Sequence, residues 1–186
     1  MTRFFWVRHG PTHVPRMVGW TDHPADLSDC GQIARLKGAL PDAPVISSDL
    51  LRARQTAEAI AGSRPRMAPL SALREFHYGA WEDQPFDAID SPKLRQYFED
   101  PGPHRAPGGE SWNDVAKRVN DAINPLLGLS PDIIVVAHMG TILTQWARAA
   151  QLAPYAALGQ KIDNLSITRI DWDGAKWQAQ WANHHP

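Results

Sequence analysis

Three short and almost wholly apolar runs divide the chain and predict buried strands. They are residues 4–7 (FFWV), 45–47 (VIS) and 132–137 (DIIVVA). A strand without polar alternation is buried on both faces, which is typical of parallel sheets covered by helices. The core IIVVA leaves no face for solvent, so residues 132–137 are expected to form a central parallel strand.

Apolar residues at helical spacing follow each of these runs. Helices are expected after an N-cap at Ser28, over residues 48–60, after an N-cap at Ser111, and over residues 141–150. Arg52 falls in the first turn of the second of these. The apolar positions that define the four helices are Ile33, Leu36 and Leu40; Leu50, Ala53, Ala57 and Ile60; Val115, Val119, Ile123 and Leu126; and Ile142, Trp146 and Ala149.

The C-terminal part of the chain has the pattern of a hairpin. Residues 166–171 and 175–181 flank Asp173-Gly174, a pair typical of a tight turn. Strands that alternate with helices and end in such a hairpin predict an α/β fold. We expect a three-layer α/β/α arrangement, in which a mostly parallel central sheet has an antiparallel edge.

The middle of the chain interrupts this alternation. Residues 84–109 contain five prolines and a mixed polar composition, which predicts a helical and loop segment that could cap a site. No internal repeat or low-complexity tract is present. We therefore expect one domain over residues 1–186, with this segment as its cap.

Composition narrows the classes of function. The 186 residues carry 19 basic and 20 acidic side chains without a long run of either sign, so neither a nucleic-acid partner nor a membrane partner is expected. Cys30 is the only cysteine, which excludes an intrachain disulfide and favours a reducing compartment. With no apolar run long enough for a signal peptide or a membrane span, we expect a cytoplasmic protein. The oligomeric state stays open.

Candidate chemistry lies where two predicted strands end. FFWVRHG and IIVVAHMG each deliver a histidine to the following loop, and ligands of open α/β sheets bind beyond these strand ends. If the two strands are adjacent, His9 and His138 meet beyond their ends, beside Arg8. Arg52 is then expected to enter the same place from the helix over residues 48–60. Two guanidinium groups and two imidazoles around one point predict a phosphate site, and a neutral histidine is a competent nucleophile toward phosphorus.

At this point the sequence resembles the histidine phosphatase superfamily, which includes cofactor-dependent phosphoglycerate mutase and many small phosphomonoesterases. The resemblance covers most of the chain and implies a phosphoglycerate mutase-like fold and no metal or other cofactor. It rests on six pieces in order: VRHGPT (7–12), GWTDHPADLSDCG (19–31), SSDLLRARQTA (47–57), LREFHYGAWED (73–83), PGGES (107–111) and VVAHMGT (135–141).

Position by position, the resemblance implies roles for five residues. His9 is the nucleophile that becomes phosphorylated, and Arg8 and Arg52 hold the phosphate. His138 is a further hydrogen-bond donor to the phosphate. Glu75 is the proton donor that later accepts a proton from water. A hydrogen bond from the other ring nitrogen of His9 to a backbone carbonyl would fix the reactive tautomer.

Other positions are expected near the site or outside it. Substrate contacts are expected from Thr12, Gly140 and Thr141, and stacking at the rim is considered for Trp20 and Trp81, although packing is the commoner role of such residues. Several residues lack any functional context: Arg54 and Arg74 are expected to be solvated, and the spacing of His13, His23, His77 and His104 matches no metal site.

Three positions depart from the pattern of the family. Pro11 stands where glutamate or glutamine is usual, Pro15 where asparagine is common, and Met139 where glycine is frequent. These departures concern the substrate more than the chemistry, and Met139 places a flexible thioether at the edge of the pocket.

The expected function is hydrolysis of a small phosphorylated metabolite through a phosphohistidine on His9. Mutases that resemble this chain are typically longer, so mutase-type phosphoryl transfer is the first alternative. A phospholigand-binding protein with weak turnover is the second, and a metal-dependent hydrolase is the least favoured enzyme. The natural substrate cannot be derived from the sequence alone.

Overall fold

The computed structural model describes all 186 residues and contains one five-stranded sheet. Its strands are β1 (Thr2–Arg8), β2 (Val45–Ser47), β3 (Asp132–Ala137), β4 (Ile167–Trp172) and β5 (Trp177–His184). The spatial order is β2-β3-β1-β4-β5, with β3 parallel to both neighbours and β4 antiparallel to β1 and β5. The predicted parallel centre with an antiparallel edge is thus confirmed.

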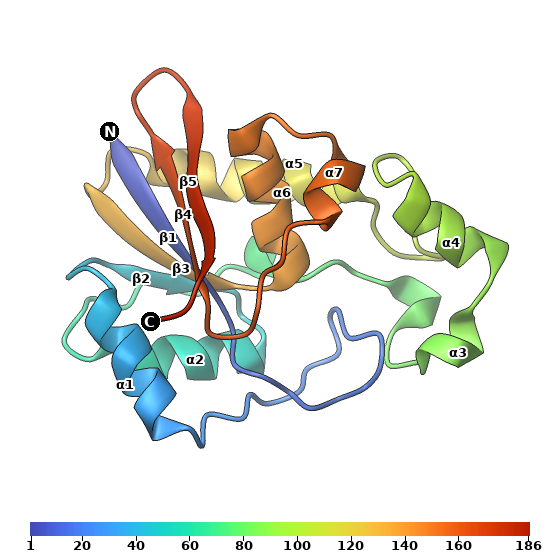
Figure 1. Cartoon of the computed structure of the whole chain (residues 1–186), viewed down its shortest axis with the longest axis horizontal. Coiled ribbons are helices and arrows are strands. Elements are labelled where there is room, and N and C mark those ends of the chain that lie inside the picture. Colours follow the sequence, from blue (N-terminus) through green and yellow to red (C-terminus); the bar gives the residue numbers. More distant parts are fainter.

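Helices cover both faces of this sheet (Figure 1). On one side lie α1 (Cys30–Ala39) and α2 (Leu51–Ala61), and on the other lie α5 (Trp112–Ile123) and α6 (Met139–Ala150). The α/β/α layering expected from the apolar pattern is therefore present. Smaller elements complete the chain: α3 (Phe86–Ile89), α4 (Pro92–Glu99), α7 (Pro154–Leu158), and the 3-10 turns Ser71–Leu73, Gly79–Trp81 and Asn124–Leu126.

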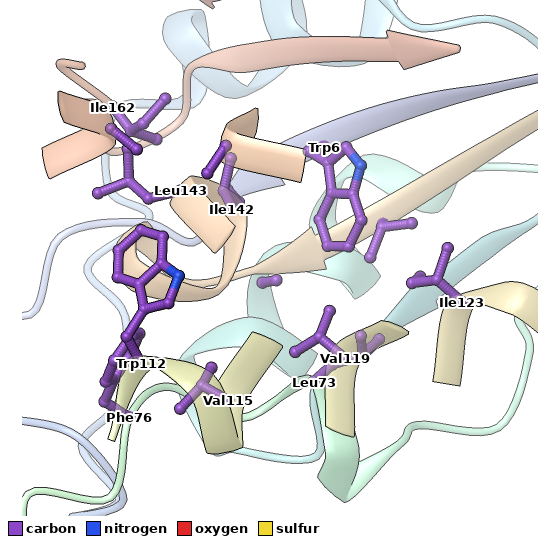
Figure 2. Packing of buried hydrophobic residues seen from close by; sticks show 14 of the residues in the cluster. Trp6, Leu73, Phe76, Trp112, Val115, Val119, Ile123, Ile142, Leu143 and Ile162 are labelled. Atoms are coloured by element: carbon purple, nitrogen blue, oxygen red, sulfur yellow. The ribbon is translucent and has the colours of Figure 1, made fainter. Parts of the chain in front are cut away.

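The alternation of side chains along each strand builds one core on each face of the sheet. Phe4 and Trp6 of β1 point into a cluster of 27 buried residues beneath α5 and α6, whereas Val7 belongs to a cluster of 12 with α1 and α2. Figure 2 shows the larger core, in which Trp6 faces Val119 of α5 and Ile142 of α6. Since both faces are covered, the strands that carry the candidate histidines are rigidly held.

The ends of the helices agree with the sequence pattern at one predicted cap and differ at another. Ser111 caps α5 in a capping box with Asp114, as its position predicts. The expected cap at Ser28 is wrong by one residue, because the side chain of Asp29 accepts the hydrogen bond from the Gln32 backbone N–H at 2.9 Å. Asp and Ser are equivalent caps, so sequence preference alone does not choose between neighbours.

The proline-rich middle segment contains two short helices, α3 and α4, which lie together at one end of the molecule (Figure 1). Trp81 anchors the base of this cap segment. It is buried and packs edge-to-face against Tyr97 of α4, with ring centroids 5.4 Å apart. Trp81 therefore fills the core, and the stacking role considered for it at the rim is wrong.

None of the helices is long and apolar enough to cross a membrane.

Candidate active site

The register of β1 and β3 brings the two candidate histidines together. Arg8 pairs with Ala137, so His9 and His138 are the next residues on two adjacent parallel strands. The His9 backbone N–H donates to Ala137 O at 3.0 Å, and the two imidazole centroids lie 5.0 Å apart. The juxtaposition predicted from the two strand ends is therefore present.

Hydrogen bonds hold the His9 ring in one tautomer. Its Nδ1 lies 2.6 Å from Gly10 O, an acceptor only, so Nδ1 carries the proton and Nε2 carries the lone pair. Arg52 Nε donates to that Nε2 at 3.2 Å. Burial, followed by the positive charge of Arg52, lowers the pKa of His9 well below its ordinary value. Both effects favour the neutral, nucleophilic form of the imidazole.

Two arginines flank this ring; Arg52 is buried and Arg8 is half-buried. Arg52, in the first turn of α2, donates from Nη1 to Thr21 O at 2.9 Å and from Nη2 to Gly19 O at 2.6 Å. Arg8 Nη1 donates to Ile162 O at 2.6 Å, while its buried Nε has no partner within the protein. Burial lowers the pKa of both guanidinium groups, yet the Coulombic attraction of Glu75 opposes this shift. Guanidinium groups that are largely withdrawn from solvent and keep unused donors are suited to binding an anion.

His138 lies directly behind His9 and is fully buried. Neither of its ring nitrogens has a hydrogen-bond partner within the protein. Burial and the nearby His9 lower the pKa of His138 well below its ordinary value, so the ring is neutral and can donate one hydrogen bond. The ring does not line the cavity in front of His9, and donation to phosphate by His138 stays a prediction.

The proton donor suggested by the resemblance, Glu75, is buried at the cavity wall. Its Oε1 accepts from the Phe76 backbone N–H and its Oε2 from the Gly140 N–H, each at 3.0 Å. Each oxygen retains a further position for a proton or a hydrogen bond. The carboxyl group is therefore oriented by backbone while it stays able to exchange a proton.

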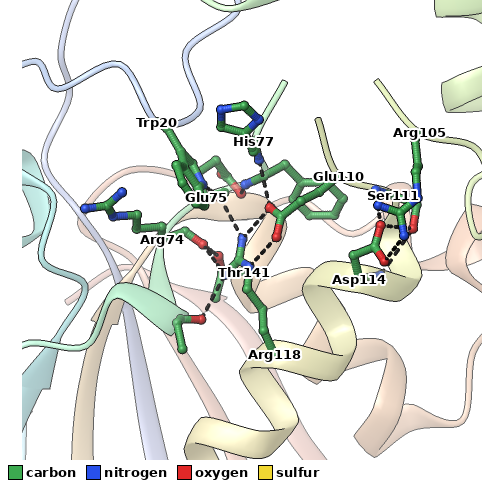
Figure 3. Close-up of polar contacts among 12 residues, drawn as sticks. Trp20, Arg74, Glu75, His77, Arg105, Glu110, Ser111, Asp114, Arg118 and Thr141 are labelled. Atoms are coloured by element: carbon green, nitrogen blue, oxygen red, sulfur yellow. Dashed lines mark hydrogen bonds and ion pairs between the residues drawn. The ribbon is translucent and has the colours of Figure 1, made fainter. Parts of the chain in front are cut away.

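An ion pair that sequence reasoning missed supports Glu75 from the other side (Figure 3). Arg118 of α5 pairs with Glu110 through two hydrogen bonds of 2.7 and 2.9 Å, and Arg118 Nη2 also donates to Glu75 O at 2.8 Å. Its Nη1 donates to the carbonyls of Ala72 and Arg74, each at 2.8 Å. The position of Glu110 within the PGGES piece was the available signal, but nothing in the sequence pairs it with a helix residue.

Glu82 is a second positioning residue that sequence reasoning missed. It lies in the LREFHYGAWED piece, and its carboxylate accepts from the backbone N–H groups of Gly19, Trp20 and Thr21 at 3.1, 2.7 and 3.2 Å, and from Thr21 Oγ1 at 2.8 Å. The carbonyls of this same loop receive Arg52. Glu82 therefore holds the loop that aims the arginine at His9.

Asn164 completes the surroundings of His9 and was also missed, because nothing marks it in the sequence. Its Nδ2 donates to His9 O at 2.7 Å from the turn that precedes β4. Close packing adds a constraint on the loop after β1, where an added Cβ on Gly10 would lie 2.6 Å from a Leu27 side-chain carbon. Asn164 thus holds the backbone carbonyl of the nucleophile, and Leu27 packs closely against the residue that follows it.

The expected substrate contacts occupy different places. Thr12 lines the cavity beside His9. Gly140 holds Glu75 through its N–H, and Thr141 is fully buried with Oγ1 donating to Arg74 O at 2.8 Å. The structure therefore gives Gly140 and Thr141 a positioning geometry away from the cavity wall, and a direct substrate contact by either stays a prediction.

Two further expectations concern charged and aromatic neighbours. Arg74 was expected to be solvated, which is wrong: it forms two 2.7 Å hydrogen bonds to Asp49 and stacks over Trp20 at 4.8 Å. Trp20 in turn donates to Glu75 O at 2.8 Å and does not line the cavity. Arg54 is exposed, as expected.

The four histidines whose spacing matches no metal site lie in separate places. Three form pairs with one carboxylate each, and the fourth, His77, meets Trp20 edge-to-face; the pairs are His13 with Asp26, His23 with Asp83, and His104 with Asp100.

A cavity of about 210 Å³ opens in front of His9 and is lined by Arg8, Arg52 and Glu75. A second and broader one, of about 490 Å³, reaches His9 and Arg8 from the side of His13 and Asn164. Pro11 and Pro15 lie on the wall of the broader cavity and Met139 on that of the smaller one. The three departures from the family pattern thus all border the candidate site.

Comparison with known proteins gives the same family for the whole chain. Residues 4–185 match the model of the histidine phosphatase superfamily (branch 1). A Cronobacter sakazakii protein named "Probable phosphoglycerate mutase GpmB" is 31% identical, covering 96% of this chain and 89% of that protein.

Two solved structures are similar over nearly their full length. The protein TTHB049 from Thermus thermophilus has 32% identity and a TM-score of 0.74, covering 97% of this chain and 99% of that one. Mycobacterial hydrolase 1 has 25% identity and a TM-score of 0.87, covering 100% and 99%. The chain belongs to the histidine phosphatase superfamily.

Proposed function

We propose that this protein hydrolyses the phosphomonoester of a small metabolite in two steps through a phosphohistidine on His9. The observation that carries the proposal is the His9 ring, which lines a cavity together with Arg8 and Arg52. Its Nδ1 proton is bound by Gly10 O, which leaves the lone pair on Nε2, where Arg52 Nε donates. Preorganised cations of this kind stabilise the charge on the equatorial oxygens of a phosphoryl group in transfer.

In the first step, His9 Nε2 attacks phosphorus while the bond to the ester oxygen breaks. Glu75, in its protonated form, gives its proton to the leaving oxygen, which departs as an alcohol. In the second step, water attacks phosphorus, Glu75 takes a proton from that water, and the P–N bond breaks. Inorganic phosphate and neutral His9 are then regenerated, with all atoms and charges balanced.

Access of water to His9 supports hydrolysis over retention of the phosphoryl group. Two cavities meet at this ring, and the broader one reaches solvent beside the exposed His13. A phosphohistidine here would border both cavities. An enzyme that keeps the phosphoryl group for return to substrate needs the opposite arrangement.

The proposal is tested with p-nitrophenyl phosphate at mildly acidic pH. We expect release of phosphate and, after a rapid non-acidic quench, mass spectrometry that finds one phosphoryl group on His9. Both signals should disappear in His9→Ala, and His104→Ala should keep them because His104 lies outside the cavity. Absence of both signals in the unmodified protein would instead favour a phospholigand-binding role.

A second candidate, phosphoglycerate mutase activity, rests on the name of the Cronobacter sakazakii relative. The discriminating assay supplies 3-phosphoglycerate together with the bisphosphate primer. Isomerisation without release of phosphate would establish the mutase and overturn hydrolysis.

A cytoplasmic location, suggested by the single cysteine Cys30, is part of the phosphatase proposal.

A further inference from the structure

We propose that the cavity in front of His9 selects phosphomonoesters whose leaving group is apolar and uncharged. This inference rests on the proposed phosphatase function and deepens it. Beyond the catalytic group, much of the wall is apolar and comes from three separate segments of the chain: Val14, Met17 and Val18 from the loop after β1, Phe86 from α3, and Met139 from the start of α6.

The two most exposed of these side chains carry the argument. Phe86 is 55% exposed and Met139 is 39% exposed, although both are large apolar residues. They belong to elements far apart in the sequence, yet they line the same cavity as His9. Single exposed apolar residues are ordinary, but apolar side chains that converge on one concave site beside polar catalytic groups are typical of ligand pockets.

Other exposed apolar residues supply the contrast. Leu152 is 40% exposed and Tyr155 is 65% exposed, and neither lines this cavity or the broader one beside it. Exposure alone therefore does not distinguish Phe86 and Met139 from Leu152 and Tyr155. Phe86 and Met139 differ because they lie together on the wall of the cavity that contains His9.

Charge in the cavity points the same way. Outside the catalytic group, Arg16 is the one cation on the wall, and Asp83 is its partner. Arg16 Nη1 lies 3.4 Å from Asp83 Oδ2 and donates to Asp83 O at 3.3 Å. Asp83 offsets part of this positive charge, so a carboxylate or second phosphate on the leaving group gains less from Arg16 than it would from an unpaired guanidinium. An uncharged apolar group would instead gain by leaving water.

The first test compares ethyl phosphate with n-hexyl phosphate, which differ only in methylene groups and have leaving groups of nearly equal acidity. We expect kcat/KM to be roughly tenfold or more higher for the hexyl ester, because each methylene group in an apolar pocket contributes to discrimination. Phe86→Ala should reduce the hexyl-to-ethyl ratio severalfold. Leu152→Ala is the matched control and should leave the ratio unchanged.

The second test concerns charge and uses 3-phosphoglycerate as an anionic substrate. We expect a lower kcat/KM for it than for hexyl phosphate, and Asp83→Asn should raise its relative rate because Arg16 then loses its anionic competitor. Asparagine tolerates the positive φ of 55° at this position, so the backbone is retained.

The outcomes separate this inference from the function on which it rests. If no ester releases phosphate, the phosphatase proposal itself fails. If esters are hydrolysed but ethyl and hexyl phosphate react equally, or if Phe86→Ala leaves their ratio unchanged, the apolar leaving-group site is refuted while the phosphatase stands. A preference for 3-phosphoglycerate over hexyl phosphate also refutes it.

Discussion

Substitution of Gly140 by alanine should disable proton transfer while it leaves the phosphate site intact. Gly140 is the second residue of α6, and its N–H donates to Glu75 Oε2. An added Cβ would lie 2.5 Å from Glu75 Oε1 and 2.6 Å from Phe76 Cδ2. Ordinary van der Waals contact begins at 3.4 Å, so the carboxyl oxygen has to move by about 0.9 Å.

The size of the effect follows from this displacement. A misplacement of about 1 Å at a reacting group costs on the order of 100-fold in rate. Overpacking against the buried Phe76 costs about 1–3 kcal/mol of unfolding free energy. The gain in helix propensity from glycine to alanine is at most about 1 kcal/mol, so the net change is destabilising. Gly140→Ala should therefore fold, but with lower stability and much lower activity.

The assay measures kcat/KM with two esters, together with inhibition by inorganic phosphate. The loss should be larger for an alkyl phosphate than for p-nitrophenyl phosphate, since p-nitrophenolate departs without a proton from Glu75. The inhibition constant for phosphate should change little because Arg8 and Arg52 are untouched. Gly38→Ala is the matched control: no atom lies within 4 Å of its added Cβ, so activity should be unchanged and stability equal or higher. Full activity of Gly140→Ala toward the alkyl ester would refute the role assigned to Glu75.

Three further outcomes are expected. Glu82→Gln places an amide N–H₂ group against backbone N–H donors, and each donor left unpaired costs about 1–3 kcal/mol. The loop that holds Arg52 should therefore loosen, and steady-state kinetics should show a KM that is roughly tenfold higher. An unchanged KM would contradict this. Arg118→Met should lower kcat more than it raises KM, because it frees the backbone carbonyl of Glu75 and leaves Arg8 and Arg52 in place. An equal change in kcat and KM would count against a role of Arg118 in positioning Glu75. His9 and His138 are held neutral by burial, with folded pKa values below the unfolded value of about 6.5, so the unfolded chain binds more protons and stability is lost as pH falls below that value. Urea unfolding should show a lower midpoint at about pH 5.5 than at about pH 7.5, with a smaller decline in His138→Gln; equal midpoints would contradict the neutral histidines.

The sheet and the nucleophile could be predicted because the signals that specify them are local. The runs at residues 4–7 and 132–137 show strands buried on both faces, and each ends directly in a histidine. Once two such strands are taken as neighbours, the meeting of His9 and His138 follows from geometry. Glu75 needed the resemblance, because a glutamate in a loop has no pattern of its own.

The supporting residues could not be predicted, since their partners are distant in the chain and are chosen by tertiary packing. Glu82 binds a loop about sixty positions earlier, and Arg118 reaches from a helix to the carbonyl of Glu75. The prediction that Arg74 is solvated is wrong for the same reason: its ion pair with Asp49 exists only because two loops are adjacent in the fold. Charged residues in loops look alike in sequence whether they are solvated or paired.

The placement of chemistry and selectivity on different parts of the chain has a consequence for how this protein can diversify. The separation of His9 and His138 is set by the distance between neighbouring strands, about 4.8 Å, and the imidazole centroids lie 5.0 Å apart. Phe86, by contrast, belongs to a short helix at one end of the molecule that takes no part in the sheet. Residues 84–88, which include it, are exposed, so they can be varied without a change in the strand spacing, whereas Tyr97 further along belongs to the core. Libraries randomised in residues 84–88 should therefore yield altered substrate ranges at a far higher frequency than libraries randomised in β1 or β3, where most variants lose turnover altogether.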